Sequence, residues 1–150
     1  MIDTELYEAK TLYPFQEKTV HSIVDELEKN GKNFNLLFQL PTGGGKTVIF
    51  SEIAKRFIEK MNEKVLILTH RIELSVQTSK QLAAIGVRNK IINSDVKKIP
   101  DQGEYNCFIA MVETLNNRLN EDGNFIEGVG LVIVDEAHYN SFRKIFQFYE

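Results

Sequence analysis

The stretch "PTGGGKT" at residues 41–47 contains the residues of this chain that most directly suggest chemistry. Its three glycines carry no side chains, so successive backbone N–H groups can turn inward and surround a phosphate. A helix that begins at once would point the positive end of its dipole at the same place. Lys46 can then reach the β- and γ-phosphates, and the Thr47 hydroxyl can hold Mg²⁺. These residues predict a loop that encloses polyphosphate.

The surroundings of this loop match the template G-x-x-x-x-G-K-[ST], which follows a strand and opens a helix. An apolar run, "NLLFQL" at 35–40, precedes the loop, and a helical pattern follows it. One departure is that Leu40 occupies the position of the first glycine. The alternative, a glycine-rich turn with a chance Lys-Thr, does not explain the context on both sides. We therefore expect polyphosphate to be bound by the loop residues Pro41, Thr42, Gly43, Gly44, Gly45, Lys46 and Thr47.

A second candidate lies in "LVIVDEAH" at 131–138, where four apolar residues are followed by two carboxylates. Ligands of an open parallel sheet collect at the carboxyl ends of its strands. Asp135 would therefore lie near Thr47 and could hold Mg²⁺ through water, while Glu136 could polarise the attacking water. Adjacent side chains of a strand point in different directions, which allows this division of roles. The alternative reading is a solvated acidic turn.

The elements that must position these residues are short and strongly apolar. Each run is too short for a typical helix and is nearly continuous, as expected for strands buried on both faces of a parallel sheet. Four runs have this character, and a fifth is weaker; they span residues 35–40, 64–69, 107–112, 131–136 and, for the weaker one, 89–94.

Helical patterns alternate with these strands. The pattern at 15–31 places Val20, Ile23, Val24 and Leu27 on one face, and the pattern at 46–61 places Ile49, Ile53, Phe57 and Met61 four residues apart. A third helix is predicted at 71–86, ending at a glycine. Strands that alternate with helices predict an α/β fold with an open, mostly parallel sheet and helices on both faces. Residues 95–105 form the longest expected surface loop, and the tail at 142–150 should form an amphipathic helix.

Composition sets the remaining bounds. A chain of 150 residues, 43% of them hydrophobic, suits one domain with a real core. The net charge of −3 excludes a generally basic nucleic-acid coat but not a local basic groove. Cys107 is the only cysteine and lies in an apolar run, so we expect a core residue. No apolar run approaches the ~20 residues that span a bilayer, and the acidic N-terminus lacks a signal-peptide pattern. We expect a cytoplasmic protein without a membrane partner.

Together, "PTGGGKT" and "DEAH" resemble the superfamily-two helicases and translocases of the DEAH type, in the branch of repair helicases and restriction-enzyme motor subunits. Three further stretches match in the expected order: "LYPFQEKTV" at 12–20, "VLILTHRIELSVQ" at 65–77 and "IAMVETLNNRL" at 109–119. The resemblance covers about residues 12–140. It implies a RecA-like ATP-binding domain that uses ATP and Mg²⁺.

The resemblance also implies roles for single residues. Gln16 would recognise adenine, although Tyr13 replaces the arginine of the family pattern. Arg71 would contact the nucleic-acid backbone from a helix N-terminus, where a basic side chain makes a phosphate site; a surface salt bridge is the alternative. Thr114 would contact the backbone as well, with a plain N-cap as the alternative. His138 would couple the state of ATP to the nucleic-acid side, with a structural hydrogen bond as the alternative.

The chain as given would be a partial N-terminal helicase ATP-binding domain, residues 1–150, because the second RecA-like domain of the family is absent from it. Since such motors hydrolyse ATP between two domains, we expect this piece alone to hydrolyse little. The leading hypothesis is the motor domain of a DNA-dependent ATPase, helicase or translocase. DNA is favoured over RNA as the partner. An RNA helicase and a non-catalytic nucleotide-binding switch or scaffold are the alternatives.

Overall fold

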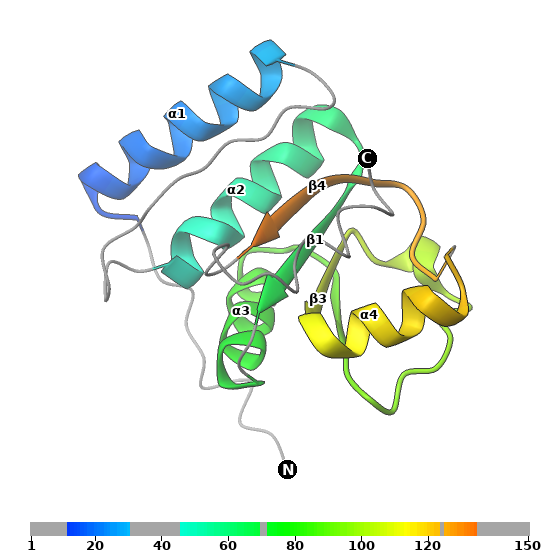
Figure 1. Ribbon diagram of the computed structural model, residues 1–150. Coiled ribbons are helices and arrows are strands. Elements are labelled where there is room, and N and C mark those ends of the chain that lie inside the picture. The colour runs from blue at the N-terminus through cyan, green and yellow to red at the C-terminus, as the bar shows by residue number, and fades with distance from the viewer. Residues whose placement is uncertain (1–11, 31–45, 70–71, 124, 135–150) are drawn as a thin grey trace.

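The computed structural model describes residues 12–30, 46–69, 72–123 and 125–134. In this part of the chain, helices and strands alternate as the sequence predicts (Figure 1). In chain order the elements are α1 (Pro14–Asn30), α2 (Lys46–Met61), β1 (Lys64–Thr69), α3 (Ile72–Ala84), β2 (Asn89–Ile92), the 3₁₀-helix η2 (Gln102–Glu104), β3 (Cys107–Met111), α4 (Val112–Glu121) and β4 (Val129–Val134).

The four described strands form one sheet in the order β2-β3-β1-β4, and every pairing is parallel. The central strand β1 is buried from Val65 to Thr69, and β3 is buried from Cys107 to Ala110. Burial on both faces explains why these strands read as continuous apolar runs in the sequence. The predicted α/β fold with an open parallel sheet is confirmed.

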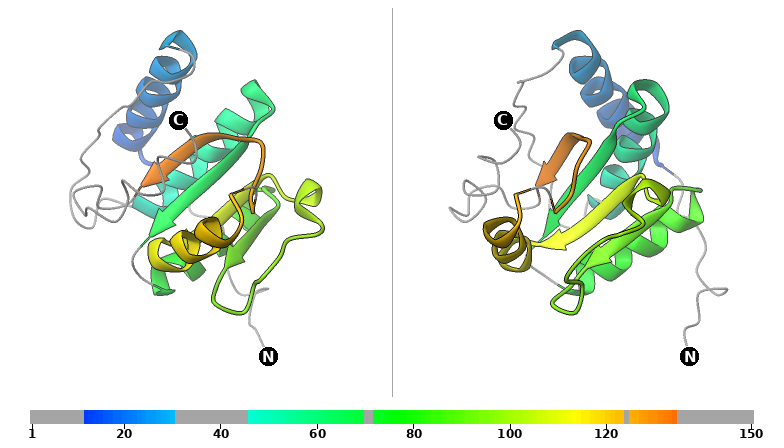
Figure 2. Two further views of the ribbon diagram at one scale, coloured as in Figure 1. Left: turned by 45° about the vertical axis from the view of Figure 1, so that its right-hand side comes forward. Right: turned by 90° about the vertical axis from the view of Figure 1, so that its right-hand side faces the viewer.

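Side chains of alternate residues separate the core into two faces. On one face, Leu66, Leu68 and Phe108 pack against Leu115 and Leu119 of α4. On the other face, the core holds Val65, Ile67, Cys107 and Ile109 together with Ala54 and Phe57 of α2 and Leu82 of α3. Helices therefore cover both faces of the sheet, with α4 on one side and α2 and α3 on the other (Figure 2).

Helix α1 lies outside the sheet and packs along α2 (Figure 1). Three residues of α1, Val20, Ile23 and Val24, meet Ile49 and Ile53 of α2 in a third apolar cluster. Two cross-helix ion pairs border this cluster: Arg56 contacts Glu17 at 2.8 Å and Lys60 contacts Glu28 at 2.8 Å. The predicted apolar faces of both helices are confirmed, except that Met61 at the end of α2 is 38% exposed.

Strand β4 pairs with β1 through an irregular register. Lys64 pairs with Val129, but Val65 pairs with Leu131, so Gly130 is an extra residue. A Cβ atom at Gly130 would lie 2.8 Å from the Glu63 side chain, so this bulge requires glycine. Val129 packs with the α4-side cluster and Leu131 with the α2-side cluster, so the bulge changes which face each later residue occupies.

Most predicted bounds agree with the structure within two residues, and one strand-to-helix junction differs by a single residue. The strand predicted at 107–112 ends at Met111, and Val112 is already the first residue of α4. Residues 95–105 form a loop with a single 3₁₀ turn at its end. The strand predicted at 35–40 and the helix predicted at 142–150 lie outside the described residues. Within the described part of the chain, none of the helices has the length and apolar character needed to cross a membrane.

Candidate nucleotide and nucleic-acid site

The carboxyl ends of the strands lie at one edge of the sheet. Thr69 at the end of β1 pairs with Met111 at the end of β3, and Leu68 pairs with Val134 at the end of β4. Helix α2 also begins at this edge, beside the ends of β1 and β4 (Figures 1 and 2). The segment that follows β4 in sequence and the loop that precedes α2 are therefore attached to neighbouring points of the structure.

Buried apolar side chains in the first turn of α2 fix the position of this turn against the core. Thr47 is half-buried, and Val48 and Ile49 behind it are buried. The first N–H groups of a helix have no partner inside the helix, so this turn offers donors and a partial positive charge to an anion. Lys46 is the first residue of α2, and its side chain lies outside the described part.

Several predicted site residues cannot be placed, because they lie outside the described residues: Pro41, Thr42, Gly43, Gly44, Gly45, Arg71, Asp135, Glu136 and His138. The described site residues are Thr47, Gln16 and Thr114. Among the described residues there is no group of three or more His, Cys, Asp or Glu side chains that could hold a metal ion. The hydroxyl of Thr47 and a carboxylate directly after β4 are nevertheless the hard oxygen ligands that Mg²⁺ prefers.

Gln16 lies in the first turn of α1, where its side chain is 3% exposed. Its Oε1 accepts a hydrogen bond of 2.9 Å from the backbone N–H of Tyr13. This bond fixes the plane of the amide, because Oε1 must face the helix start. Tyr13 and Phe15 beside it are both exposed, and their rings stack with centroids 6.2 Å apart. Gln16 therefore also caps the start of its own helix, as a glutamine at the third helical position can do.

The carboxyl end of β1 is connected to α3 by a buried polar contact. The hydroxyls of Thr69 and Ser75 lie 2.8 Å apart, and both residues are buried. This contact joins the last residue of the strand to the first turn of the next helix. It fixes both ends of the short segment that contains Arg71.

Thr114 occupies the third position of α4 and is half-buried. The N-cap of this helix is Met111, which makes no side-chain capping bond, so the alternative of a plain N-cap role for Thr114 is wrong. Because α4 follows β3 without a connecting residue, its unpaired N–H groups open at the carboxyl edge of the sheet. A hydroxyl at this position can join those donors in holding a phosphate.

Arg118 is a buried cation on α4 that the sequence analysis did not single out. Its Nε donates to the carbonyl of Val96 and its Nη2 to the carbonyl of Ser94, both at 2.8 Å. These carbonyls belong to the loop that follows β2. The helical pattern could have identified this residue, because Arg118 lies three residues after Leu115 on the core-facing stripe.

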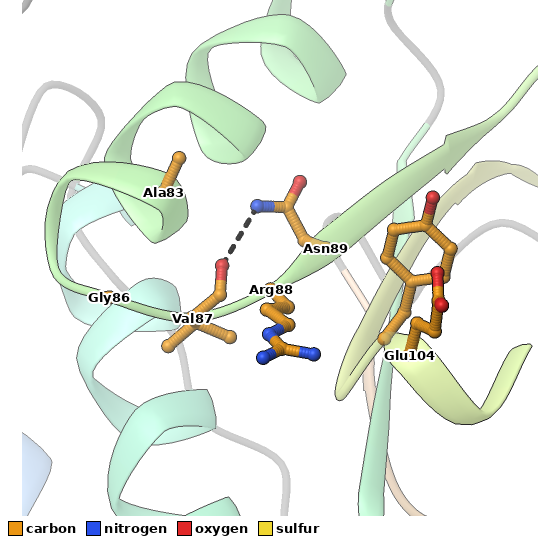
Figure 3. A pocket seen from close by; sticks show the side chains of 7 residues that line it. Ala83, Gly86, Val87, Arg88, Asn89 and Glu104 are labelled. Atoms are coloured by element: carbon orange, nitrogen blue, oxygen red, sulfur yellow. Dashed lines mark hydrogen bonds between the residues drawn. The ribbon is translucent and has the colours of Figure 1, made fainter.

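The opposite, amino-terminal edge of the sheet contains an open hollow of about 490 Å³. Figure 3 shows Arg88, Asn89 and Glu104 at this hollow, and Tyr105 lines it as well. The Asn89 side chain is held by the carbonyls of Val87 and Ser79, at 3.1 and 3.2 Å. The pKa of Tyr105 is raised, first because the carboxylate of Asp101 repels a phenolate. Of the predicted site residues that the structure describes, Gln16, Thr47 and Thr114, none lines this hollow.

Cys107 agrees with its predicted role as a core residue. It is fully buried at the start of β3, and burial raises the pKa of its thiol far above its usual range, so the thiol is not a nucleophile.

Comparison with known proteins gives one family match over most of the chain. The family described as "Type III restriction enzyme, res subunit" matches residues 9–150. IRC3 of Saccharomyces cerevisiae, provisionally named an ATP-dependent helicase, is 36% identical over 156 residues, which cover 93% of this chain and 21% of that protein. The "ATP-dependent DNA helicase Hel308" of Thermoplasma volcanium is 26% identical over 115 residues, covering 75% of this chain and 17% of that protein.

Among solved structures, the Sulfolobus solfataricus SWI2/SNF2 ATPase core in complex with dsDNA shares the fold with a TM-score of 0.69 at 17% identity. The match covers 92% of this chain and 30% of that one. This chain therefore spans about a fifth of the length of the two named relatives and under a third of this structural neighbour.

Proposed function

The chain belongs to the family described as the res subunit of Type III restriction enzymes, and from this premise we propose that it is the ATP-binding motor domain of a nucleic-acid-dependent ATPase, a helicase or translocase. Membership in this family confirms the resemblance to superfamily-two motors. The observation that carries the proposal is the start of α2 at Lys46, directly after "PTGGG", at the edge where the strands end. We expect a cytoplasmic protein.

The nucleotide roles follow from this arrangement. Lys46 binds the β- and γ-phosphates together with the backbone N–H groups of residues 41–45 and of the first turn of α2. Gln16 recognises adenine, with its amide plane set by the bond to Tyr13. Glu136 orients the attacking water and takes its proton as the water oxygen bonds to the γ-phosphorus, while the bond from that phosphorus to the β–γ bridging oxygen breaks and ADP leaves.

Thr47 and Asp135 are the residues that would hold Mg²⁺, since they offer a hydroxyl and a carboxylate next to the phosphate loop. When bound, the ion neutralises charge that develops on the phosphate oxygens. Thr47 is supported by its half-buried position in the first turn of α2. Asp135 is supported by its place directly after Val134, at the end of a strand next to β1.

The nucleic-acid side uses the two strand-to-helix junctions next to each other in the sheet. Arg71 follows β1, and Thr114 lies in the first turn of α4 after β3. Both strands end in register, so the two junctions form one row along the carboxyl edge. His138 would connect this row to the nucleotide. The full-length partner would be a second RecA-like domain, and DNA is preferred over RNA because Hel308 is named a DNA helicase.

The test is ATP hydrolysis by the full-length protein with and without DNA or RNA. A motor shows turnover that the preferred nucleic acid stimulates, and Lys46→Ala removes both turnover and ATP binding. A nucleotide-dependent switch binds ATP but gives no stimulated turnover, and this result would reject the proposal. Stronger stimulation by RNA than by DNA would keep the motor and change its substrate.

A further inference from the structure

The loop after β2 is held by three fixed points that leave two lysines exposed between them. Val96 packs partly buried against the α4-side core, and Ile99 is buried in that same core. Lys97 and Lys98 lie between these two anchors and are both exposed. The loop therefore cannot turn its apolar residues outward without losing buried contacts, and the two cations face solvent as a consequence.

Arg118 is the third fixed point. A buried guanidinium that donates to two backbone carbonyls holds both of them in one geometry, because its donors form a planar fork. Its ion pair with the exposed Glu121 is loose, at 3.8 Å, so the carbonyls of Ser94 and Val96 are its closer partners. Figure 1 shows the loop passing beside α4, in agreement with these bonds.

The position of this loop places it next to the proposed nucleic-acid row. Strand β2 is parallel to β3, so its carboxyl end at Ile92 opens at the same edge as α4. Thr114 and Arg118 are four residues apart and therefore lie on the same side of α4, about 6 Å from each other along the helix axis. The loop held by Arg118 is thus a neighbour of the hydroxyl proposed to contact the backbone.

The charges of the loop favour an anionic partner. Residues 93–99 contain two lysines and one carboxylate, Asp95. Within the described part of the chain, none of the ion pairs involves Lys97 or Lys98. A nucleic-acid backbone that already runs along the carboxyl edge supplies phosphates at this place.

We propose that Lys97 and Lys98 contact the phosphate backbone of the bound nucleic acid and extend its path across the end of β2. Arg118 is a positioning residue that acts through these lysines. This inference rests on the proposed motor function and adds a contact to it. The chemistry is charge neutralisation only, without reading of bases.

The first experiment measures single-stranded DNA binding by the full-length protein at several salt concentrations. On single strands, each neutralised phosphate contributes about 0.7 to the magnitude of the slope of log K against log[salt]. If each lysine neutralises one phosphate, the slope for the K97Q/K98Q variant should be smaller in magnitude by about 1.4. The control variant K18Q/R88Q removes two exposed cations on α1 and at the opposite edge, and its slope should equal that of the unaltered protein.

The second experiment tests Arg118 with R118K, which keeps the charge but cannot hold both carbonyls with one fork. R118K should weaken DNA binding in the unaltered protein and have no further effect in the K97Q/K98Q variant. ATP hydrolysis without nucleic acid should not change. Further weakening in the lysine-free background would show that Arg118 does not act through the lysines.

The outcomes separate this inference from the function on which it rests. If the unaltered protein binds DNA with a salt-dependent affinity and K97Q/K98Q keeps the full slope, the loop contact is rejected and the motor stands. If the unaltered protein binds neither DNA nor RNA, both proposals are rejected.

Discussion

The two edges of the sheet differ in what they offer a ligand. The amino-terminal edge has an open hollow of about 490 Å³, lined by Arg88, Glu104 and Tyr105 among others. The carboxyl edge is where the strands end in register and where the phosphate-loop and DEAH sequences attach. A hollow alone is therefore a weaker guide to function than the direction of the strands combined with the residue types that follow them.

The largest effect that separates the two edges is expected from Glu136→Gln. Loss of a general base costs about 10²- to 10⁴-fold in turnover, whereas the amide keeps the size of the side chain and nucleotide binding should be retained. Steady-state ATP hydrolysis and nucleotide binding by the full-length protein provide the measurement. Unchanged turnover would mean that Glu136 does not act in hydrolysis and that the carboxyl edge is not the catalytic site.

The next effect concerns Cys107, a titratable group at the amino-terminal start of β3. Its pKa is raised by burial in the folded state, so the folded chain keeps the proton that the unfolded chain releases above its ordinary pKa of about 8.5. The contribution of the protonated Cys107 thiol to the free energy of unfolding is fully present below that pH. Above it, this free energy falls by about 1.4 kcal/mol per pH unit.

Urea unfolding of the chain between pH 7.5 and 10.5 provides the test, with Cys107→Ala as the reference. The free energy of unfolding should fall more steeply with pH for the unaltered chain than for Cys107→Ala. Parallel curves would mean that the thiol reaches water in the folded state.

A smaller effect is expected from Gln16→Glu in the first turn of α1. A carboxylate can still accept the N–H of Tyr13 but cannot donate to adenine, so capping is kept and base recognition is lost. One lost hydrogen bond of about 1–1.5 kcal/mol reduces the preference for ATP over GTP roughly tenfold. Competition binding of the two nucleotides measures it, and an unchanged preference would leave Gln16 with only its structural role.

The smallest effect is expected at the hollow itself. Arg88→Gln and Tyr105→Ala should change ATP turnover by less than about twofold, and Arg88→Gln should change stability within about 0.5 kcal/mol, as surface substitutions do. Turnover and thermal unfolding of both variants give the comparison. A large loss of turnover would show that the amino-terminal edge belongs to the working site and would overturn the distinction between the edges.

Much of the fold could be predicted because its signals are local. The strand at 64–69 and the helix at 46–61 have the bounds that their apolar patterns predict. The end of β3 was misjudged because Val112 continues an apolar, β-branched run, whereas the backbone turns into α4 after Met111 to bury that valine. Sequence pattern marks burial well, but it does not show where a buried segment changes direction.

For the candidate site, too, local features could be predicted from the sequence, whereas contacts between distant residues could not. The motif residues at 41–47 and 135–138 were assigned from short sequence signals, and their roles remain predictions. The contact of Arg118 with the loop after β2 joins residues 22 and 24 positions apart, so no local pattern displays it. The bond between Gln16 and Tyr13 spans only three residues, so a local pattern does display it.

Gly130 has a further consequence for the face of the sheet that each side chain of β4 occupies. Side chains of a strand alternate between faces, so one additional residue reverses the phase of everything after it. Leu131 and Ile133 consequently face α2, while Val132 and Val134 face α4. A β4 strand that kept all its residues but paired with β1 without the bulge would exchange these assignments. A residue without a side chain thereby sets which face of the sheet Leu131 and Val132 occupy.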